Sequence, residues 1–519
     1  MEVYSDHKCD LTTPAIIRYA TKEINRRSEK WRKRMIREPR EFGAIERETI
    51  AWGRELAGLL AASILASEPV QSSFKAHGET IRKTAGLDKR YRRVHRLVLA
   101  AGMVIYMAAM YCCPRTSTAK RGVPRGVGRR GEDRVGLYPE WAALGIREGI
   151  SPQLQSDVGR MSVLMPSLEA ARRELDRRGV ALDIKTVRRI TLELGQQALA
   201  HRRSEVMRWL SGGMPAGDEL AGRRVVVAVD GGRARAREVK QKGKRTKNNR
   251  HRFDTPWREP KLVKIYALDD EGRLDHSQLT LVDGTLQGPD HVADLTAYYL
   301  HRLGAAKASI VHFTGDGADW IWDRVDGIAQ RAGIDSRRVS KALDISHAVS
   351  HIAKALEACA GRTPKEIRKQ QTRLKRMLLA GKTDEVIRYL NTLKHGRRAG
   401  AIQSAVDYIE KRRHLMMYHV LKKRKLPVGS GAVESAIRRV INLRIKAPGT
   451  FWKVENVEAV MHLRAQELTG RWDEMLNAVL DHSCKTRELT WKWDSDPMLK
   501  NEPQTSQPVA KTRRYKRAG

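Results

Sequence analysis

The stretch VVVAVDGG, residues 225–232, decides the fold class of this chain. A run of valines and one alanine leads to Asp230, and two glycines follow it. A short valine-rich run bounded by glycines is typical of a buried β-strand. The segment FTGDGADWIW, residues 313–322, has the same form around Asp316. Both segments therefore predict buried strands that deliver an aspartate at the edge of a sheet.

Further short apolar runs surround these two segments. They lie at residues 261–268, 277–284 and 308–316, with a helical pattern at 291–303. The run 337–356 changes from strand to helix pattern and places Asp344 and His347 at the junction. Strands that alternate with helices predict a mixed α/β sheet with its site at the strand ends. Residues 365–413 then predict two or three basic helices.

A third acid comes from GSGAVESAIRR, residues 429–439, which predicts a glycine loop opening a helix with Glu434 in its first turn. Taken singly, an Asp-Gly pair is most often a turn, and Glu434 fits a helix-start acid favoured by the macrodipole. Together, three carboxylates from separate segments supply the oxygen ligands that Mg²⁺ prefers. Two such ions about 3.5 to 4 Å apart support in-line displacement at a phosphodiester.

Composition points to a polyanionic partner. The 519 residues include 99 Lys and Arg against 60 Asp and Glu, a formal net charge of +39. Nucleic acid fits this charge best, and a membrane surface is the alternative. The five cysteines form no C-x-x-C pattern, so neither a disulfide framework nor a zinc site is expected. No secretion signal is read, and the apolar run 97–113 is expected inside a globular core, as a strand and turn or a helix.

The chain divides into four predicted regions. They are a basic, mainly helical region 1–135, a helix-turn-helix region 136–220, a catalytic core 221–475 and a basic tail 476–519. Residues 168–179 and 184–195 predict two helices joined by a turn at Gly179, which is the helix-turn-helix pattern. The candidate groove-reading residues at the front of the second helix are Lys185, Thr186, Arg188 and Arg189. Plain helical packing remains the alternative.

Four blocks carry a family resemblance: VAVDGG at 227–232, GDGADWIW at 315–322, LDISHAVSHI at 343–352 and the run LPVGSGAVESAIRRVINLRIKAPGTFW at 426–452. They resemble DDE-class transposases of bacterial insertion sequences, closest to the Kra group and distantly the Mutator-like branch. The resemblance spans about residues 151–472. It implies a ribonuclease-H-like catalytic core with an α-helical insertion at about 350–425. By the match, Asp230, Asp316 and Glu434 are the metal ligands.

The same resemblance implies roles for other residues. Asp344 and His347 become auxiliary catalytic residues, with Asp344 orienting His347 or His347 contacting phosphate. The implied DNA-binding residues after the third acid are Arg438, Arg444, Lys446 and Trp452. An i,i+4 ion pair with Glu434 is the alternative for Arg438, and a core position is the alternative for Trp452. Family members often carry cysteine pairs before the helix-turn-helix, which this chain lacks.

The resemblance implies a DNA transposase that cleaves element ends and transfers the freed 3′-hydroxyl to target DNA, using Mg²⁺, with Mn²⁺ as a substitute. The expected partners are double-stranded DNA at element ends and target, in a homodimer or larger assembly, with no membrane. The expected location is the cytoplasm, at the nucleoid. A structure-specific endonuclease without strand transfer and a catalytically dead DNA-binding protein are the alternatives. The basic loop 233–252, with ten Lys or Arg residues, and the tail are expected to bind DNA backbone.

Overall fold

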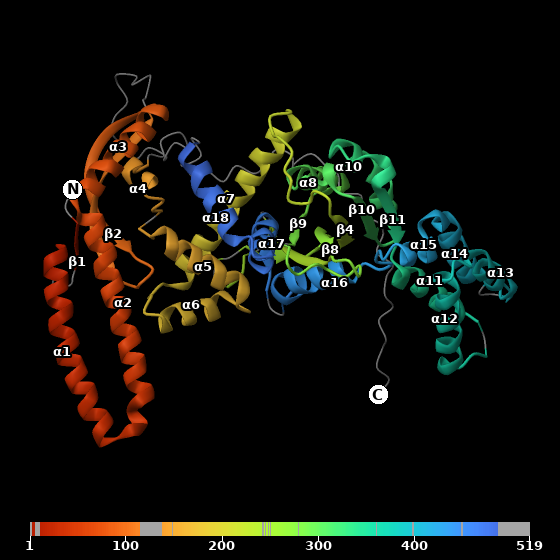
Figure 1. Ribbon diagram of the computed structural model, residues 1–519, viewed down its shortest axis with the longest axis horizontal. Coiled ribbons are helices and arrows are strands. Elements are labelled where there is room, and N and C mark those ends of the chain that lie inside the picture. Colours follow the sequence, from red (N-terminus) through yellow and green to blue (C-terminus); the bar gives the residue numbers. More distant parts are fainter. Residues whose placement is uncertain are drawn as a thin grey trace.

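The computed structural model describes residues 3–5, 11–114 and 137–485, apart from positions 148, 241–242, 244, 248, 250, 279, 360, 397–398 and 448–449. The predicted basic tail lies outside these residues from position 486 onward, and the basic loop 233–252 lies partly outside them. Figure 1 shows the N-terminal helices at one end of the molecule, a β-sheet in its middle and a second group of helices at the other end.

The N-terminal region is built from three helices and a long β-hairpin. The helices are α1 (Thr13–Arg37), α2 (Phe42–Ala66) and α3 (Glu68–Thr84). The hairpin pairs β2 (Leu87–Val98) with β3 (Val104–Pro114), and the short β1 (Val3–Ser5) pairs with β3. The expectation of helices in the region 1–135 is therefore wrong for Leu87–Val98 and Val104–Pro114, which are strands. The strand β2 could not be predicted from its own residues, because its backbone hydrogen bonds go to β3 and basic side chains fill its exposed face.

The apolar run 97–113 forms the end of β2, the turn and most of β3, so the strand-and-turn expectation is confirmed. By length and composition alone, one described segment, Pro39–Ala66, is apolar enough to cross a membrane. A single such segment is weak evidence for a membrane span. Part of α2 is accounted for by packing, since Leu59 and Ala62 are fully buried in one cluster with hairpin residues such as Ile105.

A helical region connects the hairpin to the sheet. It contains α4 (Pro139–Ala143), α5 (Pro152–Leu164), α6 (Leu168–Arg177) and α7 (Ile184–Leu210). Ser167 caps α6 by accepting the Ala170 N–H at 3.0 Å, as its position before the apolar periodicity predicts. The prediction that the second helix ends at Gly195 is wrong, because α7 continues to Leu210. Gly195 instead allows close packing on α17 (Val454–Leu468), since a Cβ there would meet the Ala459 Cβ at 2.9 Å.

A mixed five-stranded sheet forms the centre of the protein, as the valine-rich runs predict. Its strands are β4 (Arg224–Gly231), β8 (Lys261–Leu268), β9 (Leu281–Thr285), β10 (Ile310–Gly315) and β11 (Val339–Leu343). Their order is β11-β10-β4-β8-β9, with β4, β10 and β11 parallel and β8 and β9 antiparallel to their neighbours.

Helices cover both faces of this sheet. Alternate residues of β4, among them Val225 and Val227, pack with α8 (Pro289–Arg302) on one face, where α10 (Val325–Arg331) also lies. On the other face, Ala228 and the β8 residue Leu262 pack with α16 (Gly431–Ile437) and α17. Burial on both faces explains why β4 reads as a continuous apolar run rather than an alternating one.

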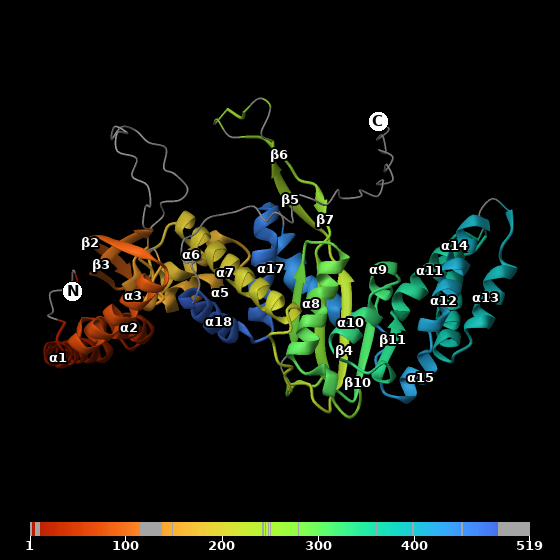
Figure 2. The same cartoon turned by 90° about the horizontal axis from the view of Figure 1, so that it is seen from above.

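A group of helices lies between β11 and α16 in the sequence. It comprises α11 (Ile345–Glu357), α12 (Pro364–Leu379), α13 (Thr383–Thr392), α14 (Ala399–Lys411) and α15 (Tyr418–Lys423). These helices share a buried cluster, which includes Leu374, Leu390 and Ile409, with residues of the central sheet such as Leu343. Figure 2 shows them beyond the β11 edge of the sheet.

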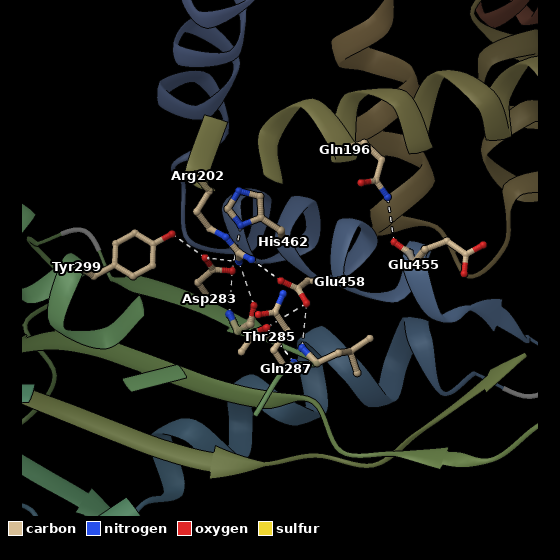
Figure 3. A network of polar contacts seen from close by, with 11 residues as sticks. Gln196, Arg202, Asp283, Thr285, Gln287, Tyr299, Glu455, Glu458 and His462 are labelled. Carbon is tan, nitrogen blue, oxygen red and sulfur yellow. Dashed lines mark hydrogen bonds and ion pairs between the residues drawn. The ribbon is translucent and has the colours of Figure 1, made fainter. Parts of the chain in front are cut away.

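A buried polar network ties α7 to the sheet (Figure 3). Asp283 on β9 is fully buried and accepts hydrogen bonds from Arg202 at 2.9 Å, Tyr299 at 2.6 Å and His462 at 3.0 Å. Arg202, on α7, also donates to Glu458 on α17. Burial alone would raise the pKa of Asp283, but the adjacent Arg202 and His462 hold it below its ordinary range. The predicted DNA-reading helix α7 is thus attached to the central sheet by buried hydrogen bonds.

Candidate active site

Strand register brings three aspartates together at one end of the sheet. Gly315 of β10 lies beside Val229 of β4 and beside Leu343 of β11 in the parallel ladder. The next residue of each strand or strand end is an aspartate: Asp230, Asp316 and Asp344. Because neighbours in register on parallel strands share a side of the sheet, these three positions are equivalent. The prediction that these acids lie at the ends of strands is confirmed.

The third predicted acid, Glu434, approaches from α16 on the face of the sheet that carries this helix. Gly232 permits the approach, since a Cβ at this position would meet the Ile441 Cδ1 at 2.5 Å in the segment that continues α16. That segment is the π-helical η7 (Arg438–Ile445). Gly232 therefore allows this helix to pack closely against the end of β4. Glu434 lies exposed in the first turn of α16.

Asp344 holds two helix starts in place. Its side chain is 1% exposed and caps α11, with Oδ1 accepting the Ser346 N–H at 2.5 Å. Its Oδ2 accepts the Ser430 backbone N–H at 2.7 Å and the Ser430 hydroxyl. Ser430 directly precedes α16, so Asp344 fixes the loop that carries Glu434. Both carboxylate oxygens are engaged in these hydrogen bonds.

His347 lies in the first turn of α11, next to this junction. Ligand atoms of Asp344, His347 and Glu434 all lie within 4.8 Å of one another, a spacing that suits metal coordination. In the part of the chain that the structure describes, the predicted set of Asp230, Asp316 and Glu434 is not drawn together this closely. The site therefore has two parts, an aspartate pair on β4 and β10 and a His-Glu pair on the two helices.

Electrostatics link the two parts. The pKa of Asp230 is raised to about 6, chiefly by burial and next by the charge of Asp316, while Glu434 adds to the rise. The Gly231 N–H, which donates to Asp230 Oδ1 at 2.7 Å, and His347 lower this pKa. Asp316, Glu434 and His347 are therefore all close enough to act on the charge of Asp230. Repulsion between carboxylates is the condition that a bound cation relieves.

The loop after Asp316 is fastened to the helical insertion. Asp316 Oδ1 accepts the Ala318 N–H at 2.9 Å, and a Cβ at Gly317 would collide with the Tyr408 hydroxyl of α14. Arg412 donates to the Gly317 carbonyl at 2.7 Å and pairs with Asp319 at 2.9 Å. Tyr408 and Arg412 are site-supporting residues that no sequence signal identified, because their partners are nearly a hundred residues away.

The predicted DNA-reading residues lie at the start of α7, as expected for their helix. Lys185 and Arg188 are exposed, whereas Thr186 donates its hydroxyl to the capping Asp183 at 2.7 Å and Arg189 pairs with Glu193 at 3.6 Å. Their contact with DNA stays a prediction.

The basic residues after Glu434 divide into exposed and buried ones. Arg438 and Lys446 are exposed, and among the described residues Arg438 makes no ion pair with Glu434, although the backbone N–H of Arg438 donates to the Glu434 carbonyl. Arg444 is 1% exposed, donates to the Ser162 carbonyl at 3.0 Å and stacks on Trp452, which is 7% exposed. Burial lowers the pKa of Arg444 to about 10, and Arg464 adds to the effect. Predicted DNA contacts of Arg444 and Trp452 are therefore corrected to packing roles, because neither side chain reaches solvent.

Comparison with known proteins gives little. No protein-family model matches the chain, and no curated protein matches it. Among solved structures, the Drosophila P element transposase strand transfer complex is similar at 13% sequence identity, over 64% of this chain and 82% of that one, with a TM-score of 0.23. A similarity at this score carries no weight for the function of the chain, which is argued below from its own residues.

Proposed function

We propose that this protein is a DNA transposase of the DDE class whose five-stranded sheet is a ribonuclease-H-like catalytic core. The single observation that carries the proposal is the strand register that aligns Asp230, Asp316 and Asp344, with Glu434 brought beside them by α16. Acids converging from separate segments at one sheet edge are typical of metal-dependent phosphodiester chemistry. The four sequence blocks that resemble insertion-sequence transposases contain these same residues.

The donor set fits a divalent cation such as Mg²⁺, with Mn²⁺ as a substitute. Asp230 and Asp316 each use Oδ1 to accept a backbone N–H, and among the described residues the second oxygen of each accepts no hydrogen bond. Glu434 is exposed beside them. We assign Asp230, Asp316 and Glu434 as metal ligands, with His347 close enough to join them. When bound, the metal supplies Lewis-acid activation of the attacking oxygen and neutralises charge at the phosphate.

Asp344 acts as a positioning residue in this proposal. Its oxygens are already engaged by Ser346 and Ser430, so its task is to hold α11 and α16 at a fixed separation. That separation sets where His347 and Glu434 stand relative to the two strand-end aspartates. An imidazole at His347 is suited to contact a phosphate oxygen or to exchange a proton with the attacking group.

Duplex DNA is the proposed substrate, at element ends and at the target, in a homodimer or larger assembly in the bacterial cytoplasm. The support is the net charge of +39 and the exposed cations Lys185 and Arg188 at the start of α7. Cations on one helix start suit contacts with DNA in the major groove or along its backbone. The polar network around Asp283 would hold α7 in a fixed position relative to the catalytic sheet.

The test incubates purified protein with labelled DNA that carries the sequences flanking the gene, together with a plasmid target, in Mg²⁺ or Mn²⁺. The proposal predicts cleavage at the ends followed by labelled DNA joined to the plasmid. Cleavage without joining would instead support the structure-specific endonuclease. Binding without cleavage in either metal would support the catalytically dead DNA-binding protein.

A further inference from the structure

A three-stranded arm extends from the catalytic end of the sheet. It consists of β5 (Ala234–Val239), β6 (Phe253–Asp254) and β7 (Trp257–Arg258), and Figure 2 shows its outer part, at β6, projecting beyond the helices around the sheet. In the antiparallel pairing, Arg235 lies opposite Trp257 and Val239 lies opposite Phe253. Opposed residues share one face of a sheet, and so do residues two apart in a strand.

One face of the arm is buried. Ala234 and Ala236 are fully buried and belong to the cluster that contains α17, and β12 (Trp452–Lys453) pairs with β5 beside them. The ion pair between Arg258 and Glu238 lies on this same face. The sequence alternation ARAREV therefore anchors the alanines and turns the arginines outward.

The opposite face combines exposed aromatic rings with cations. Trp257 is 51% exposed, Phe253 is 43% exposed, and Phe451 next to Phe253 is 41% exposed. Arg235 lies over the Trp257 ring at 4.8 Å, and Arg237 lies over the Phe253 ring at 5.2 Å. Three large aromatic side chains that are all exposed in one patch are unusual for a surface with no partner.

Three cations on this face, Arg235, Arg237 and Lys446, have no acidic partners within the described residues, whereas Lys453, which lies opposite Arg237, pairs with Glu455 at 3.5 Å. Lys446, from a distant part of the sequence, lies over the Trp257 ring at 5.5 Å. Among the described residues, neither Lys446 nor Arg235 nor Arg237 forms an ion pair. Two nearby cations off this face are paired, Lys240 with Asp254 at 2.9 Å and Arg258 with Glu238. A surface that keeps these three cations unpaired and its rings exposed is complementary to a polyanion that carries flat, apolar groups.

The arm is also close to the proposed catalytic acids. Arg235 follows Asp230 by five residues, which limits their Cα separation to roughly 18 Å. Lys446 follows η7, the direct continuation of the helix that carries Glu434. The face is therefore joined by short, structured connections to both the first and the third acid.

We propose that this face, formed by Arg235, Arg237, Phe253, Trp257, Lys446 and Phe451, binds unpaired bases of a DNA strand. The rings stack on the bases, and the cations contact the flanking phosphates. Duplex DNA offers few base faces because its bases stack on one another, so the face selects strands that are frayed or single. This inference deepens the proposed function by adding a subsite for unpaired DNA near the cleaved bond.

The test measures binding of the full chain to a labelled duplex with a short single-stranded oligothymidine tail and to the same duplex with blunt ends, in EDTA. The Trp257→Ala variant is expected to bind the tailed duplex about 5- to 100-fold more weakly, and the blunt duplex within about twofold of wild type. Trp257→Phe keeps a ring and is expected to keep most of the affinity, whereas Trp257→Leu behaves like Trp257→Ala. The control is Phe42→Ala, since Phe42 is 59% exposed on α2 and far along the chain from the arm.

Equal ratios of tailed to blunt affinity in wild type, Trp257→Ala and Phe253→Ala would overturn the inference. A change of oligomeric state in these variants with an unchanged ratio would also overturn it, because the face would then be a protein contact. Binding in EDTA needs no catalysis, so this test is independent of DNA cleavage. If the protein prefers tailed DNA but never cleaves it, the subsite is supported and only the proposed transposase activity is contradicted.

Discussion

The substitution Asp344→Asn probes how the site is assembled. An asparagine has one acceptor oxygen and one NH₂ donor, whereas both Asp344 oxygens accept N–H groups, from Ser346 at 2.5 Å and from Ser430 at 2.7 Å. In either amide orientation, one of these N–H groups faces another donor. Leaving a buried N–H unpaired costs about 1 to 3 kcal/mol, and the remaining hydrogen bond loses its charge assistance. We expect a loss of about 2 to 4 kcal/mol in the free energy of unfolding.

Metal-dependent DNA cleavage should fall by more than about tenfold in the same variant under conditions where it stays folded, because small displacements of catalytic groups are costly. Asp183→Asn is the matched control, since Asp183 is an exposed cap whose Oδ1 alone accepts both the Lys185 and Thr186 N–H groups. It should change stability by less than about 0.5 kcal/mol. Urea unfolding of the three proteins measures the difference. The same unfolding midpoint for wild type and Asp344→Asn would refute this reasoning.

Three further perturbations test other parts of the structure. Arg202→Met leaves the buried Asp283 carboxylate without its cation and should cost about 3 to 5 kcal/mol, and adding Asp283→Asn should restore part of the loss in urea unfolding; an additive double variant would contradict the coupling. Burial lowers the pKa of His312 to about 4, so the folded state resists a proton that the unfolded chain accepts near pH 6.5. About 3 kcal/mol of stability is therefore lost as pH falls from 6.5 to 4, and His312→Gln should flatten that dependence; an unchanged slope would contradict it. Gly317→Ala places a methyl group against the Tyr408 hydroxyl and should lower stability by about 1 to 3 kcal/mol in thermal unfolding, whereas Gly327→Ala, with open space around it, should not.

Local sequence patterns predicted the central part of the fold. The valine run before Asp230 and the run before Asp316 became neighbouring buried strands, because a stretch that is apolar on both faces suits only the middle of a covered sheet. The predicted start of a helix at residue 168 is also correct, and the preceding Ser167 caps it, since a cap acts within three residues. Features set by neighbours in sequence were therefore readable in advance.

Features set by distant contacts were not. The β2 strand depends on its partner β3. The sequence pattern predicts a helix end at Gly195, whereas this glycine allows the close contact with Ala459. Arg444 and Trp452 looked like surface residues in their motif, yet they pack on each other inside the protein. The anchoring of Ser430 by Asp344 joins residues 86 positions apart, so no local pattern reveals it.

In the proposed function, Asp230, Asp316 and Glu434 act together on a phosphodiester with a divalent cation. The most direct measurement compares wild type and Asp316→Asn for cleavage of labelled element-end DNA in Mg²⁺, alongside binding of the same DNA in EDTA. Cleavage by Asp316→Asn is expected to fall below detection while its DNA affinity stays within about twofold of wild type, since the amide keeps the side-chain shape and removes the anionic ligand. Cleavage by Asp316→Asn at the wild-type rate would contradict it.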